Sequence, residues 1–252
     1  MDGCTVISGG SSGIGAALAR HLAGRPGTAL ALLGRDAGRL EDTAAACRTL
    51  GATVLTGTVD VRDRDGLAAW LGALDDRHPV GTVIANAGIA ASSLPGGHPE
   101  QSGHVYEVLD VNLWGALNLV LPLLPRFKAR RRGRVVLMSS LSAFAPLPGA
   151  EGYSASKAAL LAYGLALRQQ LEPEGIAVNV VCPGFVTSPM SGRFEGWKPM
   201  EIGADDAARR IVRGLDRNHR LIAFPLPVAL AARITPLVPE SALRLAMRLF
   251  RL

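Results

Sequence analysis

The sequence has few cysteines and no long hydrophobic run. Its three cysteines, Cys4, Cys47 and Cys182, are odd in number and far apart, which excludes a disulfide framework and a cysteine-based metal site, so we expect no metal. The longest apolar stretches, 114–125 and 221–232, contain prolines and are shorter than the roughly 20 residues that cross a bilayer. The N-terminus lacks the basic and apolar regions of a secretion signal. We therefore expect a cytoplasmic protein without a transmembrane anchor.

Charged residues are also few, at 19% against 48% apolar residues, and aromatic residues make up only 5%. A disordered chain needs the opposite balance, and 252 residues fit one large domain with an ample core. The net charge of +6 would suit a nucleic-acid binder, but the densest basic run, 126–134, has Phe127 as its only stacking aromatic residue. We interpret this run as a solvated helix end and loop, with phosphate or membrane contact as the alternative, and expect no nucleic-acid partner.

Short aliphatic or β-branched runs alternate with longer helical patterns along the chain. We expect strands over 4–8, 28–33, 53–59, 82–86, 134–139, 177–182 and 221–224. Helical periodicity covers 14–23, 35–50, 62–76, 104–130, 154–172 and 205–218. This alternation predicts an α/β fold with a doubly wound, seven-stranded parallel sheet that has helices on both faces. Residues 1–225 would form one domain, and 226–252 a C-terminal amphipathic helical extension of it.

A glycine-rich turn, Ser8-Gly9-Gly10-Ser11-Ser12-Gly13-Ile14-Gly15, follows the first predicted strand and opens a helix. Glycines let a backbone approach a pyrophosphate closely, and the start of a helix offers free N–H groups to an anion. The spacing is Gly-x3-Gly-x-Gly, which by itself fits a dinucleotide site and a turn that serves only close packing equally well.

Tyr153 and Lys157 lie four residues apart, on the same face of a predicted helix. A phenol has a pKa of about 10 and is a poor acid or base at neutral pH. A nearby ammonium group favours the phenolate and lowers that pKa toward the range that acid–base catalysis requires. An isolated pair with this spacing is more often an unrelated pair of surface residues, so the remaining motifs decide its meaning.

Taken together, the motifs resemble those of the short-chain dehydrogenase/reductase superfamily. They are the glycine turn, Asn86-Ala87-Gly88, Asn112, Ser140 placed 13 residues before Tyr153, Lys157, and Pro183-Gly184. The resemblance covers about residues 3–224 and implies a single-domain Rossmann fold. It implies that Tyr153 is the general acid or base, that Lys157 lowers its pKa and holds the nicotinamide ribose, that Ser140 polarises the carbonyl, and that Asn112 positions a water in a proton relay.

The resemblance also implies the two binding sites. The cofactor would contact the following residues, in addition to Tyr153 and Lys157: Gly9, Ser11, Ser12, Gly13, Ile14, Arg35, Asp60, Val61, Asn86, Ala87, Gly88, Pro183, Gly184, Val186 and Ser188. The substrate would contact a mostly apolar set: Ser140, Ser142, Phe144, Tyr153, Phe185, Met190, Phe194 and Trp197. The loop of about 190–203 would close over it. We expect a hydrophobic or lipid-like ketone, aldehyde or alcohol.

The choice of cofactor depends on the residues that follow the second predicted strand. In the register of the family, Gly34 occupies the position of the carboxylate that accepts the ribose hydroxyl of NAD, and Arg35 follows it. A guanidinium pairs with a 2′-phosphate, so we expect NADP(H) to be preferred, with NAD(H) possible. Two alternatives stay open. Asp36 could be the acidic residue that accepts the ribose hydroxyl of NAD, or it could cap the next helix while Arg35 is merely solvated.

Several functions and partners remain open. An NAD-dependent alcohol dehydrogenase and an epimerase or dehydratase are the alternatives, although the latter usually have longer chains, and a non-enzymatic nucleotide-binding protein fits least. Relatives associate as homodimers or homotetramers through the helices that correspond to 104–130 and 154–172. The final segment carries an arginine stripe, Arg244, Arg248 and Arg251, among apolar residues. It could pack on its own domain or on a twin subunit, cover the substrate, or contact a membrane peripherally.

Overall fold

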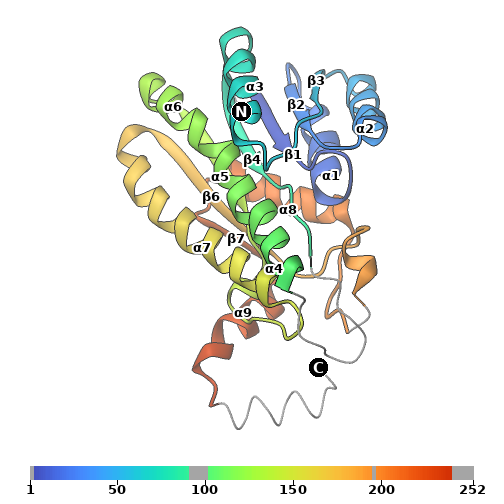
Figure 1. The fold of residues 1–252 in the computed structure, drawn as a ribbon, viewed down its shortest axis with the longest axis vertical. Helices are drawn as coiled ribbons and strands as arrows, with labels where there is room; N and C mark the ends of the chain where they lie inside the picture. Colours follow the sequence, from blue (N-terminus) through green and yellow to red (C-terminus); the bar gives the residue numbers. More distant parts are fainter. Residues whose placement is uncertain (1–2, 91–101, 195–196, 240–252) are drawn as a thin grey trace.

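A parallel sheet of seven strands forms the centre of the molecule, in the order β3-β2-β1-β4-β5-β6-β7 (Figure 1). The computed structural model describes residues 3–90, 102–194 and 197–239. The strands are β1 (Cys4–Ser8), β2 (Ala29–Leu33), β3 (Thr53–Gly57), β4 (Val80–Ala85), β5 (Gly133–Met138), β6 (Ile176–Pro183) and β7 (Leu221–Phe224). All seven expected strands are present within about two residues of their predicted ends. The strand order reverses between β1 and β4, so the doubly wound prediction is confirmed.

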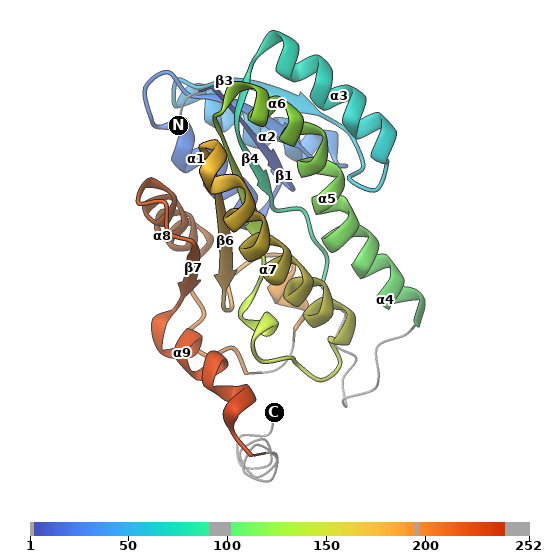
Figure 2. The same cartoon turned by 90° about the vertical axis from the view of Figure 1, so that its left-hand side faces the viewer.

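Helices cover both faces of the sheet (Figure 2). One face packs on α1 (Gly13–Ala23), α2 (Ala37–Thr49) and α8 (Ala204–Asp216). The other face packs on α3 (Arg64–Arg77), on the helical segment 102–130 and on α7 (Glu151–Leu171). A third, smaller cluster places α9 (Leu226–Ile234) against the short 3₁₀ turn Leu141–Ala143. The expected helix in the last 13 residues lies outside the described residues.

The helical segment 102–130 is divided into shorter pieces. It consists of α4 (Ser102–Leu109), a π-helical turn (Asp110–Trp114), α5 (Gly115–Val120), a 3₁₀ turn (Leu121–Leu123) and α6 (Leu124–Arg130). Pro122 and Pro125 have no N–H group to donate, which explains the change of geometry near them. Within the described residues this is the one helical stretch long and apolar enough to cross a bilayer, but Leu119, Leu123 and Phe127 are buried in the core. We interpret it as a core helix.

Three arginines of the basic run 126–134 make contacts that the prediction of a solvated helix end and loop did not include. Arg126 and Arg130 both bind the carboxylate of Asp75, which is 2% exposed, with nitrogen–oxygen distances of 2.9 Å. Arg134 donates to the Leu215 carbonyl and to the Asn179 side chain. These contacts join α6 to α3 and β5 to α8, so part of the excess positive charge stabilises the fold.

Candidate active site

The structure brings Tyr153, Lys157 and Ser140 together at the carboxyl end of the sheet. Tyr153 and Lys157 are one turn apart on α7, and the Lys157 Nζ lies 5.5 Å from the centroid of the Tyr153 ring. The Nζ donates to the carbonyl of Met138, the last residue of β5, at 2.9 Å. Ser139 Oγ in turn donates to the Lys157 carbonyl at 2.7 Å. Hydrogen bonds in both directions therefore fix α7 against the end of β5.

Ser140 begins the 3₁₀ turn Leu141–Ala143 that follows β5. Its Oγ accepts a hydrogen bond from the Ser142 N–H at 3.1 Å, and its side chain also hydrogen-bonds with Tyr153. An accepted hydrogen bond uses a lone pair of the hydroxyl and leaves its proton available to a carbonyl oxygen. The geometry therefore suits Ser140 as a hydrogen-bond donor beside the Tyr153 hydroxyl.

Burial controls the ionisation of both groups on α7. It raises the pKa of Tyr153 above its ordinary value, while the hydrogen bond with Ser140 acts in the opposite direction. It lowers the pKa of Lys157 to about 8, because an ammonium group loses hydration in the interior. The net direction for Tyr153 is therefore upward, with desolvation as the largest cause.

Asn112 is fully buried in the π-helical turn and joins three segments. Its Nδ2 donates to the Ile89 carbonyl at 2.9 Å and to Ser156 Oγ at 3.2 Å, and its Oδ1 accepts from the Ile89 N–H at 2.8 Å. A Cβ on Gly88 would lie 3.1 Å from the Asn112 Oδ1 and 3.5 Å from the Lys157 Nζ. Glycine at this position thus preserves the space between Asn112 and Lys157.

The glycine turn after β1 is packed tightly against the end of β4. Gly9 and Gly13 have φ angles of +65° and +52°, which favour glycine. A Cβ on Gly15 would lie 2.1 Å from the Gly9 carbonyl oxygen and 2.5 Å from the Asn86 Nδ2, so no larger residue fits there. The Asn86 Nδ2 donates to the carbonyls of Ser8 and Gly9 at 3.0 and 3.2 Å. Asn86 therefore holds the shape of the turn.

Sequence reasoning missed the role of Ser8, which it treated only as the first residue of the glycine turn. Ser8 Oγ accepts hydrogen bonds from the N–H groups of Asn86 and Ala87, both at 3.0 Å. The carboxyl ends of β1 and β4 are thus linked directly. The signal available in the sequence was a hydroxyl residue at the end of a buried strand, beside a strand that is followed directly by an asparagine.

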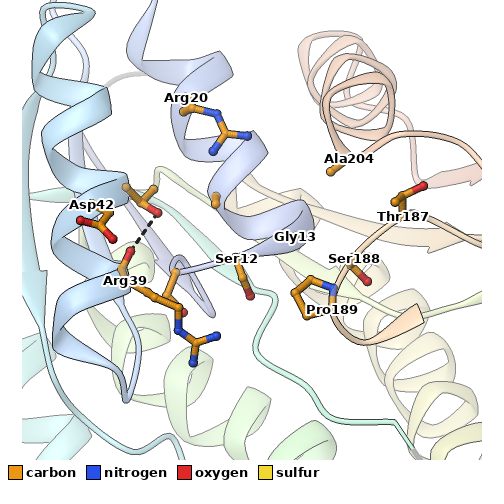
Figure 3. Close-up of a pocket in the computed structure, with 12 residues that line it drawn as sticks. Ser12, Gly13, Arg20, Arg39, Asp42, Thr187, Ser188, Pro189 and Ala204 are labelled. Atoms are coloured by element: carbon orange, nitrogen blue, oxygen red, sulfur yellow. Dashed lines mark hydrogen bonds between the residues drawn. The ribbon is translucent and has the colours of Figure 1, made fainter. Parts of the chain in front are cut away.

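Two cavities adjoin the glycine turn. Figure 3 shows the first, of about 290 Å³, where the start of α1 faces the loop after β6; its lining includes Ser11, Ser12, Gly13, Arg20, Arg39, Thr187 and Ser188. Ser12 is the N-cap of α1 but makes no hydrogen bond with its side chain to the first turn. That turn therefore has backbone N–H groups without a side-chain acceptor, as at an anion-binding helix start.

The second cavity, of about 640 Å³, collects most of the residues predicted to hold the adenosine half. Its lining includes Gly9, Ser11, Ser12, Arg35, Asp60, Val61, Ala87 and Gly88, as predicted, together with Asp36 and Arg39. Asp36 caps α2 by accepting from the Arg39 N–H at 3.0 Å and pairs with the Arg39 Nε at 2.7 Å. The structure thus shows the helix cap that had been left as an alternative. Arg39 lines both cavities, and sequence reasoning missed it.

The residues predicted at the nicotinamide end lie around the end of β6. Pro183 ends this strand, and the Gly184 N–H donates to the Phe224 carbonyl at 2.7 Å. Val186 forms an isolated bridge with Ile202, and Ser188 exchanges hydrogen bonds with Ser191. Ser188 also lines the first cavity, opposite the start of α1. The other predicted cofactor residue, Ile14, lies in the first turn of α1.

The predicted substrate residues differ in exposure. The rings of Phe185 and Phe194 contact each other at a tilt of 34°, with their centroids 5.2 Å apart, and Met190 and Trp197 are exposed. Phe144 is half-buried, with the guanidinium of Arg233 above its ring. Ser142 is buried, and its Oγ has no hydrogen-bond partner. Residues 195–196 of the expected loop lie outside the described residues.

Known proteins match the chain over most of its length. The family model described as short chain dehydrogenase matches residues 4–199. An uncharacterized oxidoreductase of Myxococcus xanthus is 31% identical over 247 residues, which cover 98% of this chain and 96% of that protein. A 3-dehydrosphinganine reductase of Arabidopsis thaliana is 36% identical over 188 residues, which cover 73% of this chain and 56% of that protein.

Solved structures agree with this assignment. A short-chain dehydrogenase from Sphingobium yanoikuyae in complex with NADPH has a TM-score of 0.81 and 30% identity, covering 97% of this chain and 95% of that chain. A bulky-bulky ketone specific alcohol dehydrogenase from Comamonas testosteroni has a TM-score of 0.79 and 26% identity, covering 98% of this chain and 94% of that chain. From the family match, the relatives and the arrangement of the site, the chain belongs to the short-chain dehydrogenase family of oxidoreductases.

Proposed function

We propose that the protein interconverts a hydrophobic or lipid-like ketone or aldehyde and its alcohol with NADP(H), and that Tyr153 is the general acid or base. The observation that carries this proposal is the meeting of Tyr153, Ser140 and Lys157 at the carboxyl end of the sheet. Similarity to a 3-dehydrosphinganine reductase and to a bulky-bulky ketone specific alcohol dehydrogenase supports the substrate class.

The residues of the two cavities fit a nicotinamide dinucleotide. The start of α1, which has no side-chain cap, would bind the pyrophosphate. Gly9 and Gly15 have no side chains and leave room for the pyrophosphate. Asp60 and Val61 would border the adenine, and Lys157 would hold the nicotinamide ribose. When bound, the cofactor supplies or accepts the hydride.

Tyr153 would transfer the proton of the reaction, and Ser140 would assist it with a hydrogen bond. With its pKa raised by burial, Tyr153 keeps its proton near neutral pH and can donate it to a developing alkoxide. The Ser140 hydroxyl would donate a second hydrogen bond to the same oxygen, which favours the alkoxide over the neutral carbonyl. In the reverse direction a deprotonated Tyr153 is required, so we expect alcohol oxidation to become faster as the pH rises.

Replacing Tyr153 with phenylalanine tests the mechanism. We expect kcat to fall roughly 10²- to 10⁴-fold, because the proton donor is lost, while the Kd for the cofactor changes little. Turnover is measured with a panel of hydrophobic ketones and alcohols, and cofactor binding by fluorescence titration. Tyr163→Phe is the matched control, since Tyr163 is a half-buried tyrosine on the same helix. Activity that survives in Tyr153→Phe would refute the proposed role.

The preference for NADP(H) rests on the charges in the second cavity. Arg35 and Arg39 both line it, and Gly34 offers no carboxylate to a ribose hydroxyl. Asp36 lies beside them, but its carboxylate is engaged by the backbone and side chain of Arg39, which hold its pKa below the ordinary value. The second carboxylate of the lining, Asp60, pairs with Arg62. With Asp36 and Asp60 both engaged by arginines, Arg35 is placed to meet an additional phosphate.

Binding of cofactor fragments tests the preference for NADP(H) without measuring turnover. We expect 2′,5′-ADP to bind more tightly than ADP, and Arg35→Ala and Arg39→Ala each to remove about tenfold of that difference, because each deletes a charge-assisted hydrogen bond. Calorimetric titration gives both dissociation constants. Arg209→Ala is the control, because Arg209 forms the same i,i+3 pair with an aspartate on α8. If both variants still prefer 2′,5′-ADP over ADP to the same extent as wild type, the proposed role of these arginines is wrong.

We also propose a cytoplasmic homodimer or homotetramer that uses the segment 102–130 and α7. Trp114 and Leu121 are exposed on the first of these, and α7 presents the small exposed side chains Ala155, Ala162 and Ala166. Small side chains allow two helices to approach closely, and large apolar ones gain from burial. Light scattering on wild type and Trp114→Glu tests this, with a lower mass expected for the variant.

A further inference from the structure

The helical segment 226–237 exposes a row of large apolar side chains. It comprises α9 and the 3₁₀ turn Thr235–Leu237. Leu226, Leu230, Ile234 and Leu237 are 64%, 48%, 55% and 82% exposed. Their spacing of four, four and three residues places them on one side of a helix. We call these four residues the outer face of α9.

The opposite side of α9 is already used for packing. Ala229 and Ala232 are buried against Leu141, Leu161 and Cys182 in the third core cluster. The helix therefore buries its small side chains and exposes its large ones, the reverse of a helix whose outer side faces only water. An exposed patch of this kind indicates a surface that binds something apolar.

The charges along this part of the chain have one sign. Arg233 is the only charged residue between 221 and 239, and it is exposed. The chain from 217 to 239 has no acidic residue, although Arg217 and Arg220 precede β7 and lie at the other end of this strand from α9. The sequence of 240–252, which lies outside the described residues, contains Arg244, Arg248 and Arg251 against the single Glu240. An apolar face accompanied by cations and almost no anions is complementary to an anionic lipid surface.

The outer face of α9 also lies close to the substrate end of the proposed active site. The helix packs on the turn that begins directly after Ser140, and Arg233 covers the ring of Phe144 at 5.4 Å. Figures 1 and 2 show α9 projecting from the end of the molecule where the strands finish. A surface bound by α9 would therefore be near Phe144, one of the residues proposed to contact the substrate.

We propose that the outer face of α9 docks the protein on an anionic lipid surface. Four side chains on one short helical segment form a small patch beside the roughly 800 Å² that each partner of a stable protein complex buries, which argues against a second copy of the chain as the occupant. Insertion of the same four side chains into lipid needs no matching partner surface. This proposal says where the protein would act, at a lipid surface, and it does not depend on the proposed function.

Vesicle sedimentation with the full chain tests the proposal. Wild type is mixed with vesicles of phosphatidylcholine alone and with vesicles that contain roughly a third phosphatidylglycerol. We expect binding to the anionic vesicles, weakened by high salt, and at least a tenfold lower partition coefficient for Leu230→Glu/Ile234→Glu, because two carboxylates replace two inserted apolar groups. Leu50→Glu is the matched control, since Leu50 is 51% exposed at the end of α2, away from α9.

Each outcome decides for or against the docking surface. Binding by wild type and Leu50→Glu but not by the α9 variant supports it. Failure of wild type to bind either vesicle, or equal binding by the α9 variant, overturns it. A change of oligomeric mass in the α9 variant, with no vesicle binding by wild type, would instead assign the face to self-association. Cofactor binding and turnover of a water-soluble ketone should be the same in all three proteins, so a failure here is distinguishable from a failure of the proposed function.

Discussion

The two ends of the sheet each bury a charged side chain, and they treat it differently. At the amino end, both oxygens of Asp75 are used: Arg126 and Arg130 bind the carboxylate, and the Val80 N–H donates to it at 2.8 Å. At the carboxyl end, the ammonium of Lys157 donates to the Met138 carbonyl. No carboxylate is recorded as a partner of Lys157 among the described residues.

This difference explains the opposite effects on charge. Hydrogen bonds from Arg130, Val80 and Arg126 overcome the cost of burial and keep the pKa of Asp75 below its ordinary value, so the charged form is the stable one. Burial prevails at Lys157 and lowers its pKa to about 8, so its charged form is destabilised. A fully paired buried charge is costly to disturb, because removing one partner leaves the other unpaired, whereas an incompletely paired charge is available for a ligand or a reaction.

Removing the charge of Lys157 should have the largest effect on activity. For Lys157→Met we expect kcat/KM to fall roughly 10²- to 10⁴-fold, because the proposed partner of Tyr153 and of the ribose is lost. Stability at pH 7 should remain similar or rise, since a destabilised buried charge disappears. Both are measured at one pH, by turnover and by urea unfolding. A large loss of stability with activity retained would assign Lys157 to the fold instead.

The same variant gives a test by pH. Between about 8 and the ordinary lysine value of 10.5, the unfolded chain binds the proton that folded Lys157 has lost. The unfolding free energy of wild type should therefore gain from Lys157 as the pH rises through this window, and the gain should be absent in Lys157→Met. A variant that shows the same slope as wild type would contradict the lowered pKa.

Removing the charge of Asp75 should affect stability and leave the chemistry intact. We expect Asp75→Asn to lose about 2–4 kcal/mol of unfolding free energy, somewhat less than a fully buried pair because the two arginines are about a third exposed. Asp76→Asn is the control: Asp76 also pairs with Arg126 but is 64% exposed, so its loss should be below about 1 kcal/mol. Urea unfolding measures the unfolding free energy of both variants. Equal losses would show that the buried Asp75 contributes no more to stability than the exposed Asp76.

The pH dependence of Asp75 has the same sign as that of Lys157, because both folded pKa values are lowered, but it falls in the acid range. Because its folded pKa is lowered, its contribution to stability is present above the ordinary carboxyl pKa and is lost as the pH falls through the folded value. Wild type should thus lose stability in acid more steeply than Asp75→Asn. Parallel curves for the two proteins would show that the carboxylate is not favoured by its partners.

Local patterns were sufficient to predict the sheet. Each strand is an apolar run bounded by turn residues, and burial on both faces makes such runs continuous, so β1 and β7 were predicted with the observed ends. The π-helical turn at Asn112 was not predicted, because it depends on the contacts of its side chain with Ile89 and Ser156 rather than on periodicity.

Contacts between distant segments explain most of what was missed. Asp75 and Arg130 are 55 residues apart, and nothing near either residue indicates the other. Arg39 looks like one more exposed helical arginine, and only the fold shows that it borders both cavities. The motifs predicted which residues would meet at the site, whereas the pKa of Tyr153 depends on burial, which a sequence does not contain.

Two neighbouring buried serines provide the smallest expected effect. Ser142 is 5% exposed and its Oγ has no partner, whereas the Ser139 Oγ donates to the Lys157 carbonyl. We expect Ser142→Ala to leave the unfolding free energy unchanged or raise it by up to about 1 kcal/mol, and Ser139→Ala to lower it by about 0.5–1.5 kcal/mol, because only the latter removes a buried hydrogen bond. If Ser142 contacts the substrate, as the sequence predicts, KM should rise in Ser142→Ala while stability does not fall. A loss of stability comparable to that of Ser139→Ala would show that the Ser142 hydroxyl has a structural partner, and its predicted place in the substrate site would lose its support.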